Sequence, residues 1–164
     1  MLRGRAFKFG DSISTDHIVP GRFTHLRSNL PELAKHAMED ADSSFVSRVK
    51  TGDFIVAGSN FGLGSSREHA ALVIKMVGVR AVLAKSVARI FFRNAINVGL
   101  PVLICDTDDI SDGDELEIDL KNGIIKNETS GKQLSFSKIP EVMLHILDSG
   151  GLLPYIQKHG DFRL

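Results

Sequence analysis

The stretch that decides the fold is FIVAGSNFGLGSSREHAALVIKMVGVRAVLA, residues 54–84. An apolar run at 54–57 predicts a strand, and a turn with three glycines follows at 58–64. A largely apolar helix is expected at 66–77, and a second apolar run at 81–84 predicts the next strand. Continuous apolar runs are typical of parallel strands that are buried on both faces. The stretch therefore predicts a strand–helix–strand unit with a parallel pair.

The same alternation continues on both sides of this unit. A helix is expected at 87–98 and a further apolar strand at 102–105, and residues 5–9 predict a first strand. Residues 21–29 have no periodicity and predict an irregular loop. A helix is expected at 30–38, since Asn29 can cap it and a proline stands in its first turn.

The pattern changes after residue 106. Residues 115–120 alternate between polar and apolar, Asn122-Gly123 is a hairpin turn signal, and 124–126 continue on the other side of that turn. A third antiparallel strand is expected around 134–136, and one last helix from Pro140 to the glycine pair at 150–151. The sequence thus predicts an α/β fold with a mixed, partly parallel sheet flanked by helices.

Composition sets the broad class of protein. The 164 residues, 43% hydrophobic and 24% charged, predict one globular domain spanning residues 1–164. Twenty basic and twenty acidic residues cancel, which disfavours nucleic-acid binding, and no apolar run is long enough to cross a membrane. Cys105 is the only cysteine, so an internal disulfide and a cluster held by several thiolates are both excluded. A cytoplasmic location is expected.

The segment GSNFGLGSSREH, residues 58–69, is the main candidate for chemistry. If a helix begins at Ser65 or Ser66, its free amides and the charge of Arg67 form a site for a carboxylate or phosphate. The alternative is plain capping, because Ser65 and Glu68 match the S-x-x-E capping box. The glycines alone do not complete a nucleotide-binding motif.

Four stretches resemble the aconitase superfamily. They are GSSREHA at 64–70, GDSISTDHIVPGRF at 10–23, KSVARIFFRNAINVGLP at 85–101 and PELAKHAMED at 31–40. The resemblance is to the free-standing small subunits of the 3-isopropylmalate dehydratase branch, which act in leucine biosynthesis. It implies a swivelling β/β/α domain that covers a large subunit carrying a [4Fe–4S] cluster, with no cofactor or metal in the small chain.

The resemblance also implies a reaction and a set of residues. A hydroxy acid loses water to give an alkene, which is then rehydrated on the neighbouring carbon. Ser65 matches the serine that removes the proton beside a carboxylate. Ser66 and Arg67 match neighbours that bind the substrate and stabilise that serine, and Asp16 matches an active-site aspartate. Without the resemblance, Asp16 reads as an ordinary turn or capping residue.

Arg27 bears on the identity of the substrate. In aconitase-like members, an arginine shortly after the TDHI motif binds a distal carboxylate of the substrate. Isopropylmalate enzymes usually have an apolar or other non-arginine residue at that place. Arg22 is a competing basic residue in the same loop. A dicarboxylate or tricarboxylate substrate is expected, with 3-isopropylmalate first and the substrates of homoaconitase or of a substituted-malate dehydratase as alternatives. A rival of another class is a non-catalytic carboxylate-binding module.

Other polar residues receive no chemical role from the sequence. The six histidines lack the spacing of metal ligands, and His69 is expected to pack near the serine loop. Cys105 ends an apolar strand and is expected to be buried. Arg89, Arg93 and Asn97 share one helix face, which either contacts the site or a partner, or is simply polar.

Overall fold

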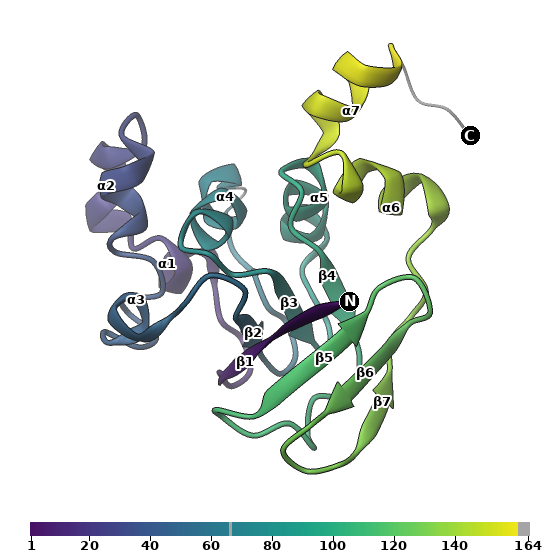
Figure 1. The fold of residues 1–164 in the computed structure, drawn as a ribbon. Helices are drawn as coiled ribbons and strands as arrows, with labels where there is room; N and C mark the ends of the chain where they lie inside the picture. The colour runs from purple at the N-terminus through teal and green to yellow at the C-terminus, as the bar shows by residue number, and fades with distance from the viewer. Residues whose placement is uncertain (66, 161–164) are drawn as a thin grey trace.

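A seven-stranded mixed sheet forms the centre of the computed structural model, which describes residues 1–65 and 67–160 (Figure 1). The strands follow the order β4-β3-β2-β1-β5-β6-β7. They are β1 (Leu2–Lys8), β2 (Phe54–Val56), β3 (Ala81–Ala84), β4 (Val102–Ile104), β5 (Glu115–Asp119), β6 (Ile124–Asn127) and β7 (Gln133–Ser135). The prediction of an α/β fold with a mixed, partly parallel sheet is confirmed.

Strand β1 joins the two halves of the sheet. Its second half pairs in parallel with β2, with Ala6 opposite Phe54, and its first half pairs antiparallel with β5, with Leu2 opposite Ile118. Strands β2, β3 and β4 continue the parallel half, and β5, β6 and β7 form an antiparallel meander. Strand β1 therefore belongs to both the parallel half and the antiparallel half of the sheet.

Both faces of the parallel half are buried, which explains its continuous apolar runs. Alternate residues such as Ile55 and Val82 pack under the helices. Their neighbours Phe54 and Leu83 pack against apolar residues of the meander, including Ile118. The meander thus covers one face of the parallel strands and the helices cover the other, which gives the expected β/β/α layering.

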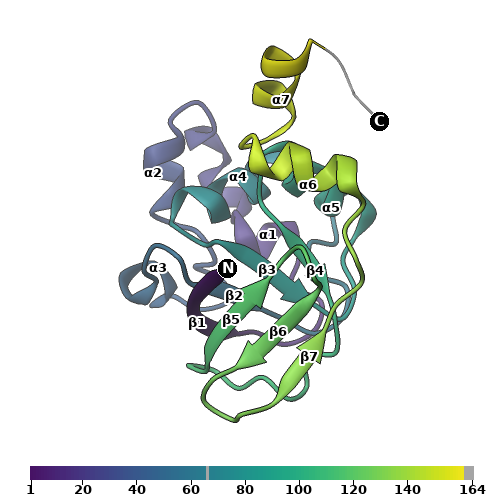
Figure 2. The same ribbon diagram turned by 45° about the vertical axis from the view of Figure 1, so that its right-hand side comes forward.

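The helices lie mainly on one side of the parallel strands, and α7 projects beyond the rest at the top of both ribbon views (Figures 1 and 2). They are α1 (Thr15–Ile18), the 3-10 helix η1 (Gly21–Leu26), α2 (Leu30–Ala34), α3 (Phe45–Arg48), α4 (Glu68–Met76), α5 (Arg89–Asn97), α6 (Glu141–Asp148) and α7 (Leu152–His159). No helix of the described ranges is long and apolar enough to span a bilayer.

Two local predictions were wrong, and one helix was not predicted. The segment expected as a loop at 21–29 is largely the 3-10 helix η1. The helix capped by Asn29 ends at Ala34, because the backbone amide of Met38 bonds the carbonyl oxygen of Ile18 at 3.0 Å instead of continuing the helix. The helix expected from Pro140 to the glycine pair is confirmed as α6, and α7, which begins directly after that pair, was not predicted.

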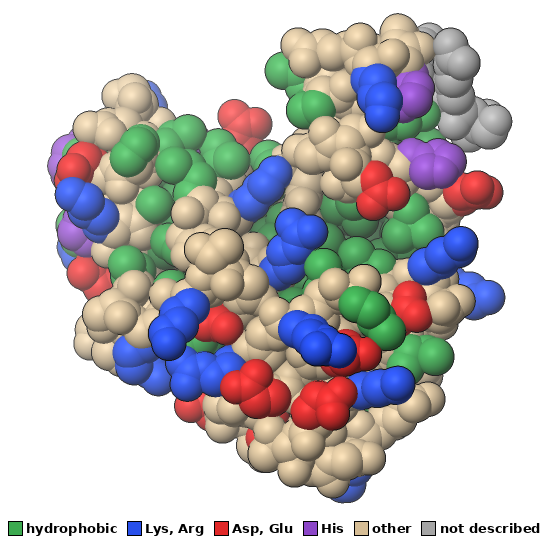
Figure 3. Space-filling view, in the orientation of Figure 1, with side chains coloured by type: hydrophobic (Ala, Val, Ile, Leu, Met, Phe, Trp, Pro, Cys, Tyr) green, Lys and Arg blue, Asp and Glu red, His purple; other side chains and the backbone are tan. Residues whose placement is uncertain are grey.

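Charged side chains are spread over the surface without a large field of one sign. Lysine and arginine side chains alternate with aspartate and glutamate side chains on the face seen in Figure 3. This arrangement agrees with the formal net charge of zero. Any attraction for an anionic substrate must therefore come from a local group of residues.

Candidate active site

The serine loop, residues 58–67, connects β2 to α4 and is anchored on both sides by backbone hydrogen bonds. On one side, the amide of Thr15 donates to the carbonyl of Leu63 at 2.8 Å. On the other, the amide of Ala88 donates to the carbonyl of Phe61 at 2.9 Å. These bonds hold the loop between the TDHI segment and the start of α5, beyond the carboxyl ends of the parallel strands, where ligands of open α/β sheets bind.

Gly62 lies in this loop at a point where a side chain has no room. Its φ of +80° is in the left-handed region that favours glycine, and a Cβ placed there would lie 2.9 Å from Cδ2 of Phe91 and closer still to its Cγ. Phe91 is buried and belongs to α5. The close approach of loop and helix therefore requires glycine, and it fixes the path of the chain toward Ser65.

Ser65 is exposed, and its hydroxyl oxygen lies 3.5 Å from the hydroxyl oxygen of Thr15. Thr15 is only 3% exposed, so its side chain is held firmly beside the serine. Nothing in the sequence pattern singles out Thr15 beyond its place in the TDHI motif. The pair places a second hydroxyl within reach of the candidate base.

The predicted helix start was wrong. Helix α4 begins at Glu68, its N-cap is Arg67, and no side chain caps it. Before that point the amide of Arg67 bonds the carbonyl of Ser65 at 2.8 Å, which closes a tight turn. Ser65 is therefore neither the first helical residue nor a capping-box serine. Its hydroxyl does not accept a hydrogen bond from the backbone amides at the start of α4. Ser66, also predicted to bind substrate, lies outside the described residues.

Asp16 and Arg67 are brought together although they are 51 positions apart in the chain. The Nη1 atom of Arg67 donates to Oδ1 of Asp16 at 3.1 Å and to the carbonyl of Val19 at 2.8 Å. The same Asp16 oxygen accepts the amide of Gly21 at 2.9 Å. Within the described chain the Nη2 and Nε donors of Arg67 remain free, and these are the atoms that could hold a carboxylate.

A small cavity of about 220 Å³ opens beside Arg67. Arg27, Thr24 and His69 also line it, and its apolar wall consists of Val19 and Leu33. Arg27 is exposed, and its guanidinium has no hydrogen-bond or ion-pair partner among residues 1–65 and 67–160. The cavity therefore combines two cationic side chains with an apolar wall, a combination suited to a small branched carboxylic acid.

Arg22 does not face this cavity. Its Nη2 atom contacts Asp40 at 2.8 Å and Glu39 at 3.0 Å. The hydrogen bond from Arg22 lowers the pKa of Asp40, and the same bond raises the pKa of Arg22. The structure thus separates the two arginines that the sequence left as alternatives, because one is already paired.

The structure also tests what was expected of His69 and Cys105. His69, expected near the serine loop, lines the cavity beside Arg67, and Cys105 is buried as predicted, with burial raising its pKa to about 11.

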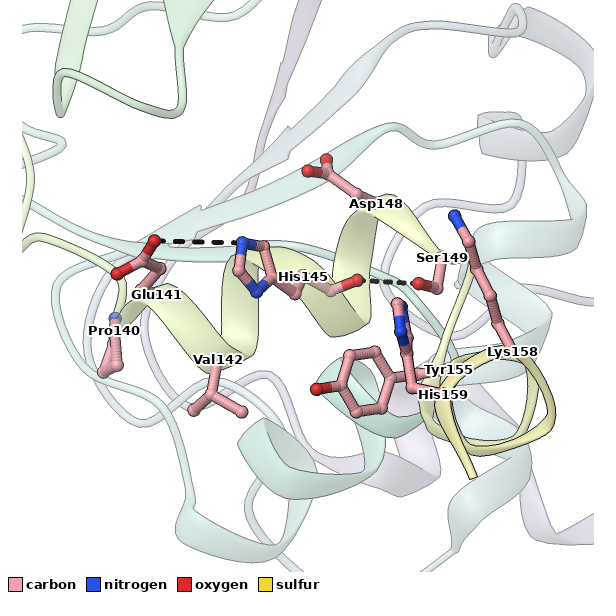
Figure 4. A pocket seen from close by; sticks show the side chains of 9 residues that line it. All are labelled: Pro140, Glu141, Val142, His145, Asp148, Ser149, Tyr155, Lys158 and His159. Carbon is pink, nitrogen blue, oxygen red and sulfur yellow. Dashed lines mark hydrogen bonds and ion pairs between the residues drawn. The ribbon is translucent and has the colours of Figure 1, made fainter. Parts of the chain in front are cut away.

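A larger cavity of about 740 Å³ lies between α6 and α7, away from this site (Figure 4). It is lined only by residues of the range 140–159, including His145, whose Nε2 lies 3.9 Å from the Oε1 of Glu141. None of the predicted site residues that the structure describes lines it.

Comparisons with known proteins agree with this geometry. The family model of the aconitase C-terminal domain matches residues 11–107. The 3-isopropylmalate dehydratase small subunit 2 of Archaeoglobus fulgidus is 66% identical, with 98% of each chain covered. The small subunit 1 of Thermotoga maritima is 61% identical, with 99% of this chain and 98% of that protein covered.

A solved structure extends the likeness to three dimensions. The crystal structure of 3-isopropylmalate dehydratase (leuD) from Methanocaldococcus jannaschii has a TM-score of 0.93 and 48% identity. The match covers 97% of this chain and 95% of that one. The sequence relatives and the shared fold thus point to one group of proteins, and the chain belongs to the 3-isopropylmalate dehydratase small-subunit family of the aconitase superfamily.

Proposed function

We propose that the chain is the small subunit of a hydro-lyase that isomerises a branched 2-hydroxy dicarboxylate, 3-isopropylmalate, by dehydration and rehydration. The names of its full-length relatives support this reaction. The observation that carries the proposal is that Ser65, the Asp16–Arg67 pair and the cavity lined by Arg27 are grouped beyond the carboxyl ends of the parallel strands.

In the proposed reaction the Ser65 oxygen removes a proton from the carbon beside a substrate carboxylate. The electron pair of the broken carbon–hydrogen bond forms the double bond as the carbon–oxygen bond on the neighbouring carbon breaks. The leaving hydroxide, which a [4Fe–4S] cluster on the partner would accept as a Lewis acid, and the proton taken by Ser65 together make up the water that is lost. Water then adds back with its hydroxyl on the other carbon and its proton on the first. A serine hydroxyl is a weak base, and its alkoxide form must be stabilised by nearby positive charge and hydrogen-bond donors. Arg67 supplies the charge, and the Thr15 hydroxyl can supply the donor at 3.5 Å.

Arg67 orients the substrate in this scheme. Asp16 and the Val19 carbonyl hold its Nη1 atom, so the plane of the guanidinium is set before the substrate arrives. The remaining donors on Nη2 and Nε can then bind both oxygens of a carboxylate. Asp16 thus acts on the substrate through Arg67 and is a positioning residue.

The residues of this chain do not fit an iron–sulfur cluster. Cys105 is the only cysteine, it is buried, and in the described ranges no three His, Cys, Asp or Glu side chains are grouped as a metal site. We propose that a large subunit carries the [4Fe–4S] cluster that the family resemblance implies. We also place the pair in the cytoplasm, a location supported by the free thiol of Cys105.

A second candidate substrate is favoured by Arg27. An unpaired guanidinium on the cavity wall suits a distal carboxylate, as in the substrates of homoaconitase or of a substituted-malate dehydratase. The apolar side chains of Val19 and Leu33 on the same wall suit the isopropyl branch. The two candidates differ in which of these groups contacts the distal part of the substrate.

Reconstitution with the large subunit tests the catalytic role of Ser65. Ser65→Ala is expected to lower kcat by a factor of about 100 or more while binding of the large subunit is unchanged. Ser59→Ala is the matched control, because Ser59 is an exposed serine of the same loop. Near-normal turnover by Ser65→Ala would refute the mechanism. It would favour a carboxylate-binding module, which should bind ligand as an isolated chain.

An activity panel on the reconstituted pair tests the substrate. Isopropylmalate, homoaconitate, citrate and methylated malates are compared for the wild type, for Arg27→Leu, and for Arg22→Leu as the control. If Arg27 binds a distal carboxylate, Arg27→Leu lowers kcat/KM for homoaconitate far more than for isopropylmalate. An equal loss on all substrates, or an equal loss in the Arg22→Leu control, would contradict a role of Arg27 in specificity.

A further inference from the structure

An apolar groove of about 420 Å³ lies between α5 and α6 and continues to the start of α7. Its floor is formed by apolar side chains of one packed cluster, in which Ile96 and Ile146 are buried and the others are partly buried: Phe92, Ile96, Val142, Met143, Ile146 and Leu152. Its polar rim consists of Arg89, Arg93 and Asn97, which follow one another at intervals of one helical turn on α5. In both ribbon views α6 lies next to α5 (Figures 1 and 2).

The two arginines on the rim have no partners in the part of the chain that the structure describes. Both are exposed, and neither donates a hydrogen bond or forms an ion pair within residues 1–65 and 67–160. By contrast, Arg22, Arg48 and Arg67 each contact a carboxylate. Two unpaired guanidinium groups above an apolar floor are complementary to a segment that carries both apolar and acidic side chains.

Helix α5, which forms one wall of the groove, begins beside the serine loop. Val87, just before α5, pairs with Phe61 of the serine loop, and Phe91 in the first turns of α5 lies directly against Gly62. Arg89 therefore begins the rim only two residues beyond the anchored loop. From there α5 extends for nine residues, or about 13 Å.

We propose that this groove is a docking surface for the large subunit, which inserts an apolar segment flanked by aspartate or glutamate side chains. The proposal rests on the proposed function for the identity of the partner. If Ser65 acts on a substrate held by that partner, the edge around Ser65 faces the partner, and the groove extends the same contact along α5. It also gives a role to the polar face of α5 that the sequence left open.

Binding of the full chain to the large subunit tests the groove by titration calorimetry at low and high salt. The double variant Arg89→Glu/Arg93→Glu is expected to weaken binding at least about tenfold at low salt, with a smaller effect at high salt. Arg80→Glu makes half of that charge change, with the same substitution, at an exposed position just before the amino end of β3, and should bind like the wild type. Met143→Gln tests the floor, and each variant is first checked for an unchanged melting temperature.

Wild-type affinity of the double variant overturns the proposal. A second outcome also overturns it: the wild-type small subunit forms a dimer, and the double variant dissociates that dimer without changing the affinity for the large subunit. The groove would then join two copies of this chain. These outcomes are separate from a failure of the proposed function. That failure would appear as a Ser65→Ala pair with normal turnover, whatever its affinity.

Discussion

The packing of Gly62 against Phe91 gives a sharp prediction about how the serine loop is held. Replacing Gly62 with alanine adds one methyl group at a backbone φ of +80° and within 2.9 Å of Phe91 Cδ2. Both effects act on the folded state, because the unfolded chain has neither the φ constraint nor the contact. The expected result is a loss in the free energy of unfolding, together with a displacement of the loop that lowers turnover.

Two terms set the size of the loss. A non-glycine residue in the left-handed region costs about 1–2 kcal/mol. Forcing an extra methyl group into a packed core costs about 1–3 kcal/mol. Gly62→Ala should therefore lower the free energy of unfolding by about 2–5 kcal/mol, which for a chain of this size lowers Tm by at least about 4 °C.

Two other glycines separate the terms. Gly131 has a φ of +77° with nothing within 4 Å of an added Cβ, so Gly131→Ala measures the backbone term alone. Gly10 has open space and no positive φ, so Gly10→Ala should change little. Urea unfolding of the three variants gives the comparison. Equal losses for Gly62→Ala and Gly131→Ala would refute the argument that contact with Phe91 constrains the loop.

Three further substitutions have expected outcomes of their own. Thr107 is 1% exposed and its hydroxyl donates to the carbonyl of Ala57 at 2.7 Å, so Thr107→Val should lower the free energy of unfolding in urea by about 1–3 kcal/mol. Asp53 accepts two backbone amides at 3.0 and 2.8 Å, and Asp53→Ala should cost at least as much in the same assay, whereas a loss below the measurement error would contradict its anchoring role. Burial raises the pKa of Cys105 from 9.0 to about 11, so between these pH values the folded state keeps the thiol proton and the unfolded state loses it. The contribution of the protonated thiol to the free energy of unfolding is therefore present below pH 9 and is lost as the pH rises toward 11. The wild type should therefore lose about 2 kcal/mol more than Cys105→Ala over that window, and parallel curves for the two proteins would count against it.

Much of the fold follows from local patterns. The apolar runs at 54–57, 81–84 and 102–105 predict buried parallel strands, and the structure confirms them with shifts of one residue at most. The hairpin signal at Asn122-Gly123 likewise predicts the β5–β6 turn. These predictions hold because burial of a strand on both faces requires a continuous apolar run, and burial on one face requires polar and apolar residues to alternate. Both patterns are visible without any knowledge of distant contacts.

Local patterns failed where a distant contact competes with them. The helix expected at 30–38 stops early because the Met38 amide bonds Ile18, some twenty positions away. The S-x-x-E match at Ser65 predicts a cap, yet the loop is anchored to other segments and the helix starts only at Glu68. In both cases a backbone group finds a tertiary partner that a sequence window does not contain.

The sequence by itself determined the mixed sheet, the serine loop and the family resemblance, because each depends on short stretches of adjacent residues, and the layering was expected only from the resemblance. Only the tertiary structure decided that Thr15 lies beside Ser65, that Asp16 holds Arg67, and that among the described residues Arg27 has no partner while Arg22 is paired. The Thr15–Ser65 and Asp16–Arg67 contacts join residues 50 and 51 positions apart. Side chains that distant meet only when the sheet closes, so their geometry is a property of the whole fold.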